Sequence, residues 1–162
     1  MKAQHQNAQV RIVDFPHTPV AALAHHGDPA RIGDTVRQFI GWRKEHKLPP
    51  RVSATFNIIH NNPAEVGPDA YHMDLCAATD ITIAPNAYGV VQQAIPAGRC
   101  AVLRHVGSDD TIGDTVMHLY ANWLPHSGEE TRDYPLFFQR VSLFPDVPED
   151  EMIVDIFLPL KG

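Results

Sequence analysis

The apolar residues of this chain follow two spacings, one typical of strands and one typical of helices. Short runs rich in β-branched and aromatic residues, separated by turn residues, predict strands. The expected strands are 10–15, 20–26, 52–60, 71–79, 90–96, 100–106, 136–144 and 152–160. Two apolar stripes at helical spacing predict helices that begin at Ile32 and Ile112. The expected order of elements is therefore strand, strand, helix, strand, strand, and this order occurs twice.

The repeated order of elements is accompanied by a repeat in the sequence. A stretch of 21 residues from Pro16 matches the stretch 80 residues further on at ten positions. A match this dense indicates a tandem duplication of a ββαββ unit, with repeats at about 8–80 and 88–161. Because each repeat is too small to bury much surface alone, we expect the two to share one domain over residues 1–162.

The longest identical segment, IGDTV, opens each expected helix, at 32–36 and again at 112–116. Glycine lets a helix approach a sheet closely, and an aspartate in the first turn favours the positive helix end. Asp28 and Ser108 precede the two helices and are suitable N-caps. We therefore interpret IGDTV as an architectural motif and not as an active site.

Strands that follow one another without an intervening helix favour antiparallel pairing and an α+β fold. We expect hairpins between 10–15 and 20–26 and between 90–96 and 100–106, with one main helix per repeat covering one face. A pseudo-twofold arrangement of the repeats would place equivalent residues around a central groove. Such a groove is where a ligand site is expected.

Composition and charge limit the classes of function. Of 162 residues, 44% are hydrophobic and the formal net charge is −6, which is a poor match to a phosphate backbone. Direct nucleic-acid binding is therefore not expected. The negative net charge is compatible with a cationic small ligand or a basic partner. We find no apolar run long enough to span a membrane and no signal-peptide pattern, so we expect a cytoplasmic protein without a membrane partner. Cys76 and Cys100 are expected to be buried, reduced thiols.

Motifs for metal, cofactor or nucleophile chemistry are not recognised. Adjacent His25 and His26 would point to opposite faces of a strand, and the repeat-equivalent pair His25 and His105 has no nearby carboxylate. No zincin-type histidine spacing, nucleotide-binding glycine motif or serine-hydrolase motif is present. We expect structural histidines, no metal, no cofactor and no catalytic residue.

Four segments of the second repeat carry a resemblance to a known family. They are AGRCAVLRHVG (97–107), NWLPHSG (122–128), YPLFFQRV (134–141) and MIVDIFLPLK (152–161). In this order they resemble the GyrI-like domain, the effector-binding domain of many AraC-type transcription activators and of the stand-alone DNA gyrase inhibitor. The resemblance implies a duplicated, SHS2-like module that binds small lipophilic, often cationic molecules in a central pocket. Some members of the family hydrolyse reactive cyclopropane-bearing compounds.

One departure from the family pattern bears on function. Gln139 stands where the family usually has a pocket glutamate, and Val141 where it has an aromatic residue. A carboxylate can hold a cation and move a proton, whereas a carboxamide only exchanges neutral hydrogen bonds. A register slip of one residue would not bring an acid to this position, because the sequence neighbours are Phe138 and Arg140. We interpret Asp74 and Asp155 as structural or solvent-facing, and they are the best spare acids.

The resemblance and the strand alternation together predict a set of ligand-binding residues. The candidates are Gln139, Phe137, Trp123, Tyr71, Phe56, Asn57, Tyr120 and Phe157. Phe137 and Gln139 share a strand face. Asn57 is expected to be the first-repeat equivalent of Gln139. Trp123 either caps the cavity or ends a core stripe, and Tyr71 either lines the groove or packs at a strand end.

Two classes of function follow. The first is a stand-alone effector-binding domain that senses, sequesters or protects against a lipophilic, possibly cationic molecule, without an attached helix-turn-helix region. The alternative is a hydrolase of cyclopropane-bearing compounds, against which the amide of Gln139 argues. A protein partner, either gyrase or a regulator, is implied only by the resemblance.

Overall fold

A computed structural model describes residues 9–62, 65–142 and 146–162. Parts of three expected features lie outside the described ranges. They are residue 8 at the start of the expected first repeat, residues 63–64 between the expected strands 52–60 and 71–79, and residues 143–144 at the end of the expected strand 136–144. The structure is α+β with antiparallel sheets and two main helical segments, as the sequence predicts. Its residues group into two compact units, His17–Pro96 and Ala97–Gly162 with the N-terminal residues up to Pro16.

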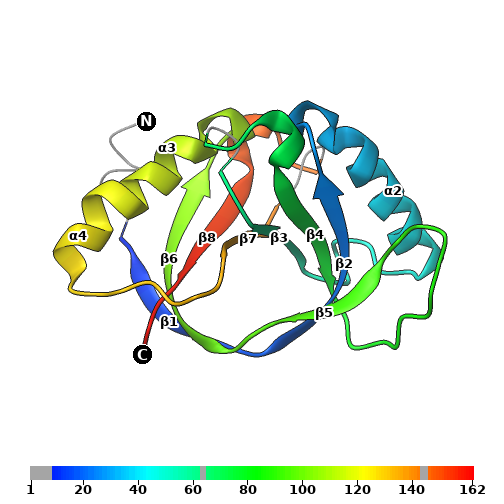
Figure 1. Cartoon of the computed structure of the whole chain (residues 1–162), viewed down its shortest axis with the longest axis horizontal. Coiled ribbons are helices and arrows are strands. Elements are labelled where there is room, and N and C mark those ends of the chain that lie inside the picture. The colour runs from blue at the N-terminus through cyan, green and yellow to red at the C-terminus, as the bar shows by residue number, and fades with distance from the viewer. Residues whose placement is uncertain (1–8, 63–64, 143–145) are drawn as a thin grey trace. The chain divides into compact units, whose positions relative to one another are not determined.

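The 17–96 unit is a four-stranded antiparallel sheet with one helix. Its elements are β2 (Thr18–His26), η1 (Pro29–Arg31), α2 (Ile32–Glu45), β3 (Thr55–Ile59), η2 (Pro68–Ala70), β4 (His72–Ala78) and β5 (Val91–Ile95). The strand order is β3-β4-β2-β5. Helix α2 packs on β2 and β4, as Figure 1 shows. Phe39 and Trp42 of this helix form a core with Leu23, Met73 and Leu75 of the sheet.

The second unit has the same composition of one sheet and one helical segment. Its elements are β1 (Arg11–Phe15), β6 (Gly98–Val106), η3 (Asp109–Thr111), α3 (Ile112–Met117), the π-helical η4 (His118–Trp123), α4 (Leu124–Ser127), β7 (Leu136–Arg140), η5 (Glu149–Glu151) and β8 (Ile153–Pro159). The strand order is β1-β6-β8-β7, and α3 packs on β6. No helix among the described residues is both long and apolar enough to cross a membrane.

The expected hairpins are wrong. β1 pairs with β6 and not with β2, and β5 pairs with β2 and not with β6. Each four-stranded sheet therefore contains one strand from the other expected repeat. The alternation of apolar and polar residues identifies a strand and its buried face, but it does not identify the strand's partner.

The repeated IGDTV motif begins α2 and α3, and its threonine explains why a histidine is repeated with it. His25 Nδ1 lies 2.7 Å from Thr35 Oγ1, and its Nε2 lies 3.0 Å from the carbonyl oxygen of Asp28. His105 repeats both contacts with Thr115 and Ser108, at 2.8 and 3.0 Å. The geometry fits Nε2–H donating to the carbonyl while the hydroxyl donates to Nδ1. These histidines join strand, turn and helix within each unit.

The side chains of Asp28 and Ser108 also cap the turns as expected, each accepting a bond from the backbone N–H two residues on. Such bonds satisfy amides that the first turn of a helix leaves without a partner. Asp28 and Ser108 are thus N-caps of the short turns η1 and η3, whereas α2 and α3 follow these turns with Arg31 and Thr111 as N-caps and no side-chain cap bond.

Replacing Thr115 with valine is expected to lower the free energy of unfolding by about 1–3 kcal/mol. Thr115 and His105 are both fully buried, so Nδ1 would lose its donor without access to water. The equivalent Thr35→Val should cost less, because Thr35 is only half-buried. Urea denaturation checks both values, and equal losses would contradict the role assigned to burial.

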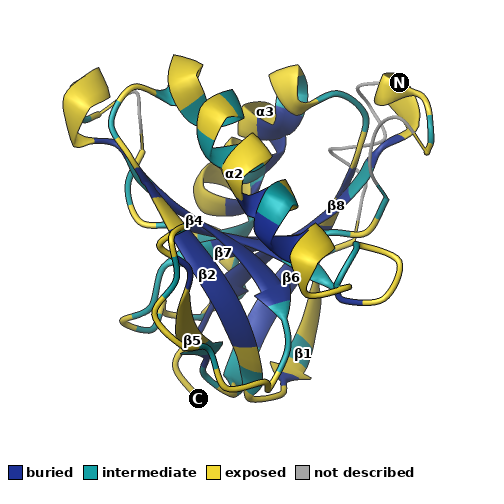
Figure 2. Cartoon of the chain, turned by 90° about the vertical axis from the view of Figure 1, so that its right-hand side faces the viewer, coloured by how far each residue is buried: buried dark blue, intermediate teal, exposed yellow. Residues whose placement is uncertain are grey.

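Each sheet has one face under its helix and one face turned away from it, which we call the far face. In the second unit the far face carries Phe15, Val102, Phe137 and Phe157, all of them buried. In the 17–96 unit it carries Phe56, Ile58, Asp74 and Cys76. Figure 2 shows β2 and β4 largely in the colour of buried residues, whereas the outward sides of the helices are exposed.

The two cysteines are free and buried, as predicted.

Candidate functional site

Three phenylalanines form a cluster on the far face of the second unit. The rings of Phe137 on β7 and Phe157 on β8 stack in parallel, with centroids 4.9 Å apart and an interplanar angle of 3°. Phe15 on β1 meets both rings edge-on, at 5.0 and 5.2 Å. The antiparallel register places Phe137 directly opposite Phe157. Three strands thus supply one continuous aromatic cluster, and all three of its rings are buried.

A polar row lies immediately beside this aromatic cluster. Gln139 is the register partner of Asp155, two residues from the stacked phenylalanines on both strands. Asp155 accepts bonds from Arg104 Nε at 2.8 Å and Arg104 Nη2 at 3.1 Å. The hydrogen bond to this carboxylate raises the pKa of Arg104 above its ordinary value. The strand register thus places an acid opposite Gln139, and this acid is paired with Arg104.

The chemistry of this surface suits binding more than proton transfer. The three rings are buried, at 1–8% exposed, and the half-buried Gln139 beside them is the nearer group to solvent. Gln139 adds an uncharged donor and acceptor. Arg104 and Asp155 offset each other's charge, and both oxygens of the carboxylate are engaged by the guanidinium.

The register also corrects the expected equivalence of Asn57 and Gln139. Ile58 is opposite Asp74 as Gln139 is opposite Asp155, so Ile58 holds the equivalent position. Asn57 is opposite Leu75, which belongs to the core beneath α2. Phe56 holds the position equivalent to Phe137 and lies on the far face of its own unit.

The remaining candidates lie elsewhere. Tyr71 is buried in the core beneath α2, and its hydroxyl lies 3.6 Å from Met73 Sδ, so it shares a face with Asn57 and not with Phe56. Tyr120 and Trp123 lie in the π-helical η4, partly exposed. Burial raises the pKa of Tyr120. π-Helical turns are rare and occur frequently at functional sites.

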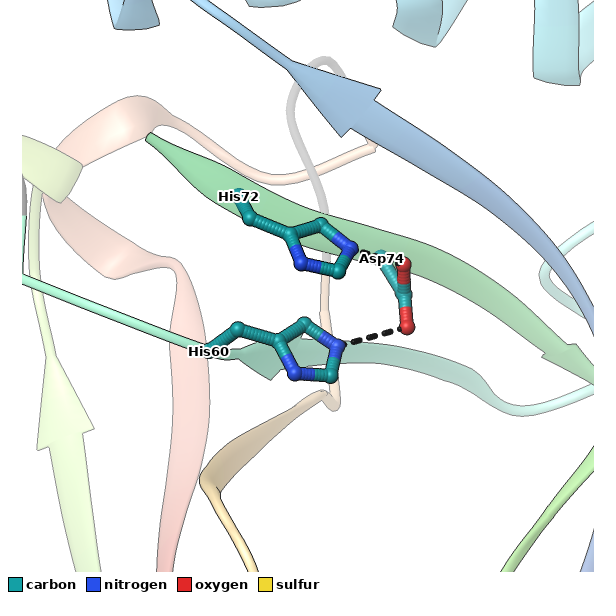
Figure 3. Close-up of side chains that lie close together, drawn as sticks. All are labelled: His60, His72 and Asp74. Carbon is teal, nitrogen blue, oxygen red and sulfur yellow. Dashed lines mark hydrogen bonds and ion pairs between the residues drawn. The ribbon is translucent and has the colours of Figure 1, made fainter. Parts of the chain in front are cut away.

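The structure assembles a second group of residues that sequence reasoning missed. His60, His72 and Asp74 gather on the 17–96 unit, as Figure 3 shows. Asp74 Oδ2 lies 2.8 Å from His60 Nε2, and Asp74 Oδ1 lies 3.2 Å from His72 Nε2. Burial, and then the nearby His60, lower the pKa of His72, which favours its neutral form. His72 and Asp74 are two residues apart on one strand, so the sequence alone could have placed them on the same face. The approach of His60 could not be seen in the sequence, because it depends on the pairing of β3 with β4.

A scan against protein-family models matches residues 8–161 to the GyrI-like small molecule binding domain. The chain belongs to this family.

A relative of this chain agrees with that assignment, and a solved structure shares the fold. The "Probable transcriptional regulator YgiV" of Escherichia coli K12 is 40% identical over 152 residues, covering 93% of this chain and 95% of the relative. The "DNA gyrase inhibitor" of Edwardsiella ictaluri is 28% identical over 138 residues, covering 83% of this chain and 87% of the relative. The crystal structure of the EcmrR C-terminal domain matches the fold with a TM-score of 0.76 at 16% identity, covering 96% of this chain and 98% of that chain.

Proposed function

We propose that this chain is an effector-binding protein whose small-molecule ligand contacts the far face of the β1-β6-β8-β7 sheet. The observation that carries the proposal is the stacked pair Phe137 and Phe157, with Phe15 edge-on, beside the uncharged Gln139. Ligand sites are generally apolar and aromatic, with a few polar groups that fix orientation. Membership of a small-molecule-binding family supports the same assignment.

The polar row suggests what kind of ligand this face takes. Arg104 and Asp155 together carry no net charge, and Gln139 adds none. We therefore infer a lipophilic, ring-containing ligand that is neutral or weakly cationic. The alternative function, hydrolysis of cyclopropane-bearing compounds, requires a general acid or base, and Asp155 is engaged by Arg104.

The biological role we infer is that of a ligand sensor or a sequestering protein. The name of the Escherichia coli relative supports a sensor in transcription regulation, and that of the Edwardsiella relative supports gyrase as a protein partner. The central groove, the single domain and a cytoplasmic location remain predictions. We also propose that the segments 8–80 and 88–161 arose by duplication of a ββαββ unit, which the paired His–Thr contacts support.

Replacing Gln139 with glutamate is expected to raise the affinity for a lipophilic cationic dye roughly five- to tenfold at pH 7. A charge-assisted contact is worth about 1–3 kcal/mol more than a neutral one. We expect the lower end, because a like charge at Asp155 directly opposite opposes ionisation of the new carboxylate. Fluorescence titration measures the change.

Two controls make this test specific. Gln139→Met keeps a similar side-chain size without charge and should give no gain, and a neutral dye should not distinguish glutamate from glutamine. The gain should disappear on acidification, since a protonated carboxyl carries no charge. Unchanged dye affinity of Gln139→Glu at pH 7 would show that this side chain does not contact the ligand.

A further inference from the structure

Three histidines occupy adjacent positions across three neighbouring strands of the 17–96 unit. His26 ends β2 and is the register partner of His72 at the start of β4. His60 follows β3, and its backbone N–H donates to the carbonyl of His72 at 3.2 Å. The ring of His72 stacks between the other two, with centroids 4.1 Å from His26 and 3.9 Å from His60. Antiparallel pairing thus brings together imidazoles that are 12 residues or more apart in sequence.

One carboxylate serves two of these rings. The side chain of Asp74 is only 3% exposed, and its two oxygens face the Nε2 atoms of His60 and His72 separately. The two imidazoles are 30% and 29% exposed, so solvent reaches the group from the histidine side. Figure 3 shows both Nε2 atoms directed toward the carboxylate. A buried anion is therefore approached from the solvent side by two nitrogen donors.

We propose that His60, His72 and Asp74 bind a divalent first-row transition-metal ion such as Zn²⁺. The three donor atoms lie within 4.8 Å of one another. Neighbouring ligands of a zinc ion are about 3 Å apart when each metal–ligand bond is about 2.0–2.2 Å. The nitrogen–oxygen distances of 2.8 and 3.2 Å already have this spacing. The ion would replace the hydrogen-bonded protons between the rings and the carboxylate.

The donor set selects the class of ion. Two imidazoles and one carboxylate suit zinc, nickel, cobalt or iron, whereas calcium and magnesium prefer all-oxygen sites. For both nitrogens to converge on one ion, the rings of His60 and His72 would rotate from their near-parallel stacking, which has an interplanar angle of 10°. Three protein ligands leave coordination positions for water or for a small-molecule donor. Bound metal would join the end of β3 to β4 and stabilise this unit.

Calorimetric titration of the untagged protein with Zn²⁺ tests the site. We expect one saturable site per chain. Removing a ligand in His72→Gln, His60→Gln or Asp74→Asn should weaken binding by more than about tenfold each. Because Asp74 is buried, its variant tests the fold as well, and His60→Gln keeps the test informative if Asp74→Asn does not fold. His17→Gln, at an exposed histidine of the same unit, is the matched control and should bind as the unchanged protein does.

A second readout reports coordination directly. Co²⁺ in place of Zn²⁺ should give visible absorption bands of low coordination number, and these bands should be absent in His72→Gln. Zinc should also raise the melting temperature of the unchanged protein but not that of the ligand variants. Absence of saturable binding, or binding that survives in His60→Gln and His72→Gln while His17→Gln loses it, would overturn the proposal. The dye titration at position 139 is independent of every one of these outcomes.

Discussion

Replacing Phe137 with alanine is expected to lower the free energy of unfolding by about 3–5 kcal/mol. The ring is 1% exposed, stacks on Phe157 and is met edge-on by Phe15, which contacts Phe157 as well. Its removal loses the transfer free energy of a phenyl group and leaves a cavity between two aromatic neighbours. Urea denaturation followed by circular dichroism measures the loss.

Two further variants separate burial from stacking at this position. Phe137→Leu keeps most of the apolar volume and should cost only about 1–1.5 kcal/mol, the contribution of the aromatic pair. Val141→Ala, at a residue 45% exposed, is the surface control and should stay within about 0.5 kcal/mol. A loss below about 1 kcal/mol in Phe137→Ala would show that the ring is not packed against Phe15 and Phe157.

The same substitution is expected to act on a strand far away in sequence. Phe15 belongs to β1, which pairs with β6 and contributes its aromatic ring to the cluster. Hydrogen exchange of the β1 amides should therefore accelerate in Phe137→Ala, since local opening follows the loss of buried contacts. If the exchange rates of the β1 amides did not change, the backbone pairing of β1 with β6 alone would be what holds this strand in place.

Replacing Arg43 with methionine is expected to cost about 2–4 kcal/mol. The guanidinium is buried on α2 and donates to the carbonyl oxygens of Leu48 and Ser53 and to Thr55 Oγ1, at 2.7, 2.7 and 2.8 Å. These bonds fix the segment between α2 and β3. Burial lowers the pKa of Arg43 to about 10, so the group stays charged at neutral pH although its desolvation offsets part of the gain.

A lysine at the same position distinguishes charge from geometry. Arg43→Lys keeps the charge but cannot reproduce a planar fork that reaches three acceptors, so we expect it to lose most of the same stability. Lys44→Met, at the exposed neighbour on α2, is the control and should change stability by less than about 0.5 kcal/mol. Full stability of Arg43→Lys in thermal melts would show that charge alone is what this site requires.

The local features of the fold were predictable because they depend on neighbours in sequence. The structure places the IGDTV helix starts as expected, and Asp28 and Ser108 cap the short turns that precede these helices. The π-helical η4 was not predictable, since the stripe through Tyr120 and Trp123 also fits an ordinary α-helix.

Features that depend on strand partners could not be derived from the sequence. The alternation in 10–15 predicts a strand, but only the structure shows that it pairs with β6. The same limit hid the position of Asp155 opposite Gln139 and the approach of His60 to His72. Phe137 and Gln139 were placed correctly on one face, because two residues on the same strand need no partner.

The central claim is that the far face of the β1-β6-β8-β7 sheet contacts the ligand. A nuclear magnetic resonance titration with a lipophilic cationic dye tests it most directly, followed on the side-chain amides of Gln139 and Asn57. The far face carries Gln139, whereas Asn57 lies beneath α2. The account predicts that the Gln139 amide signals shift and saturate with the dye while those of Asn57 stay in place. Saturable binding that shifts Asn57 and leaves Gln139 unmoved would contradict it.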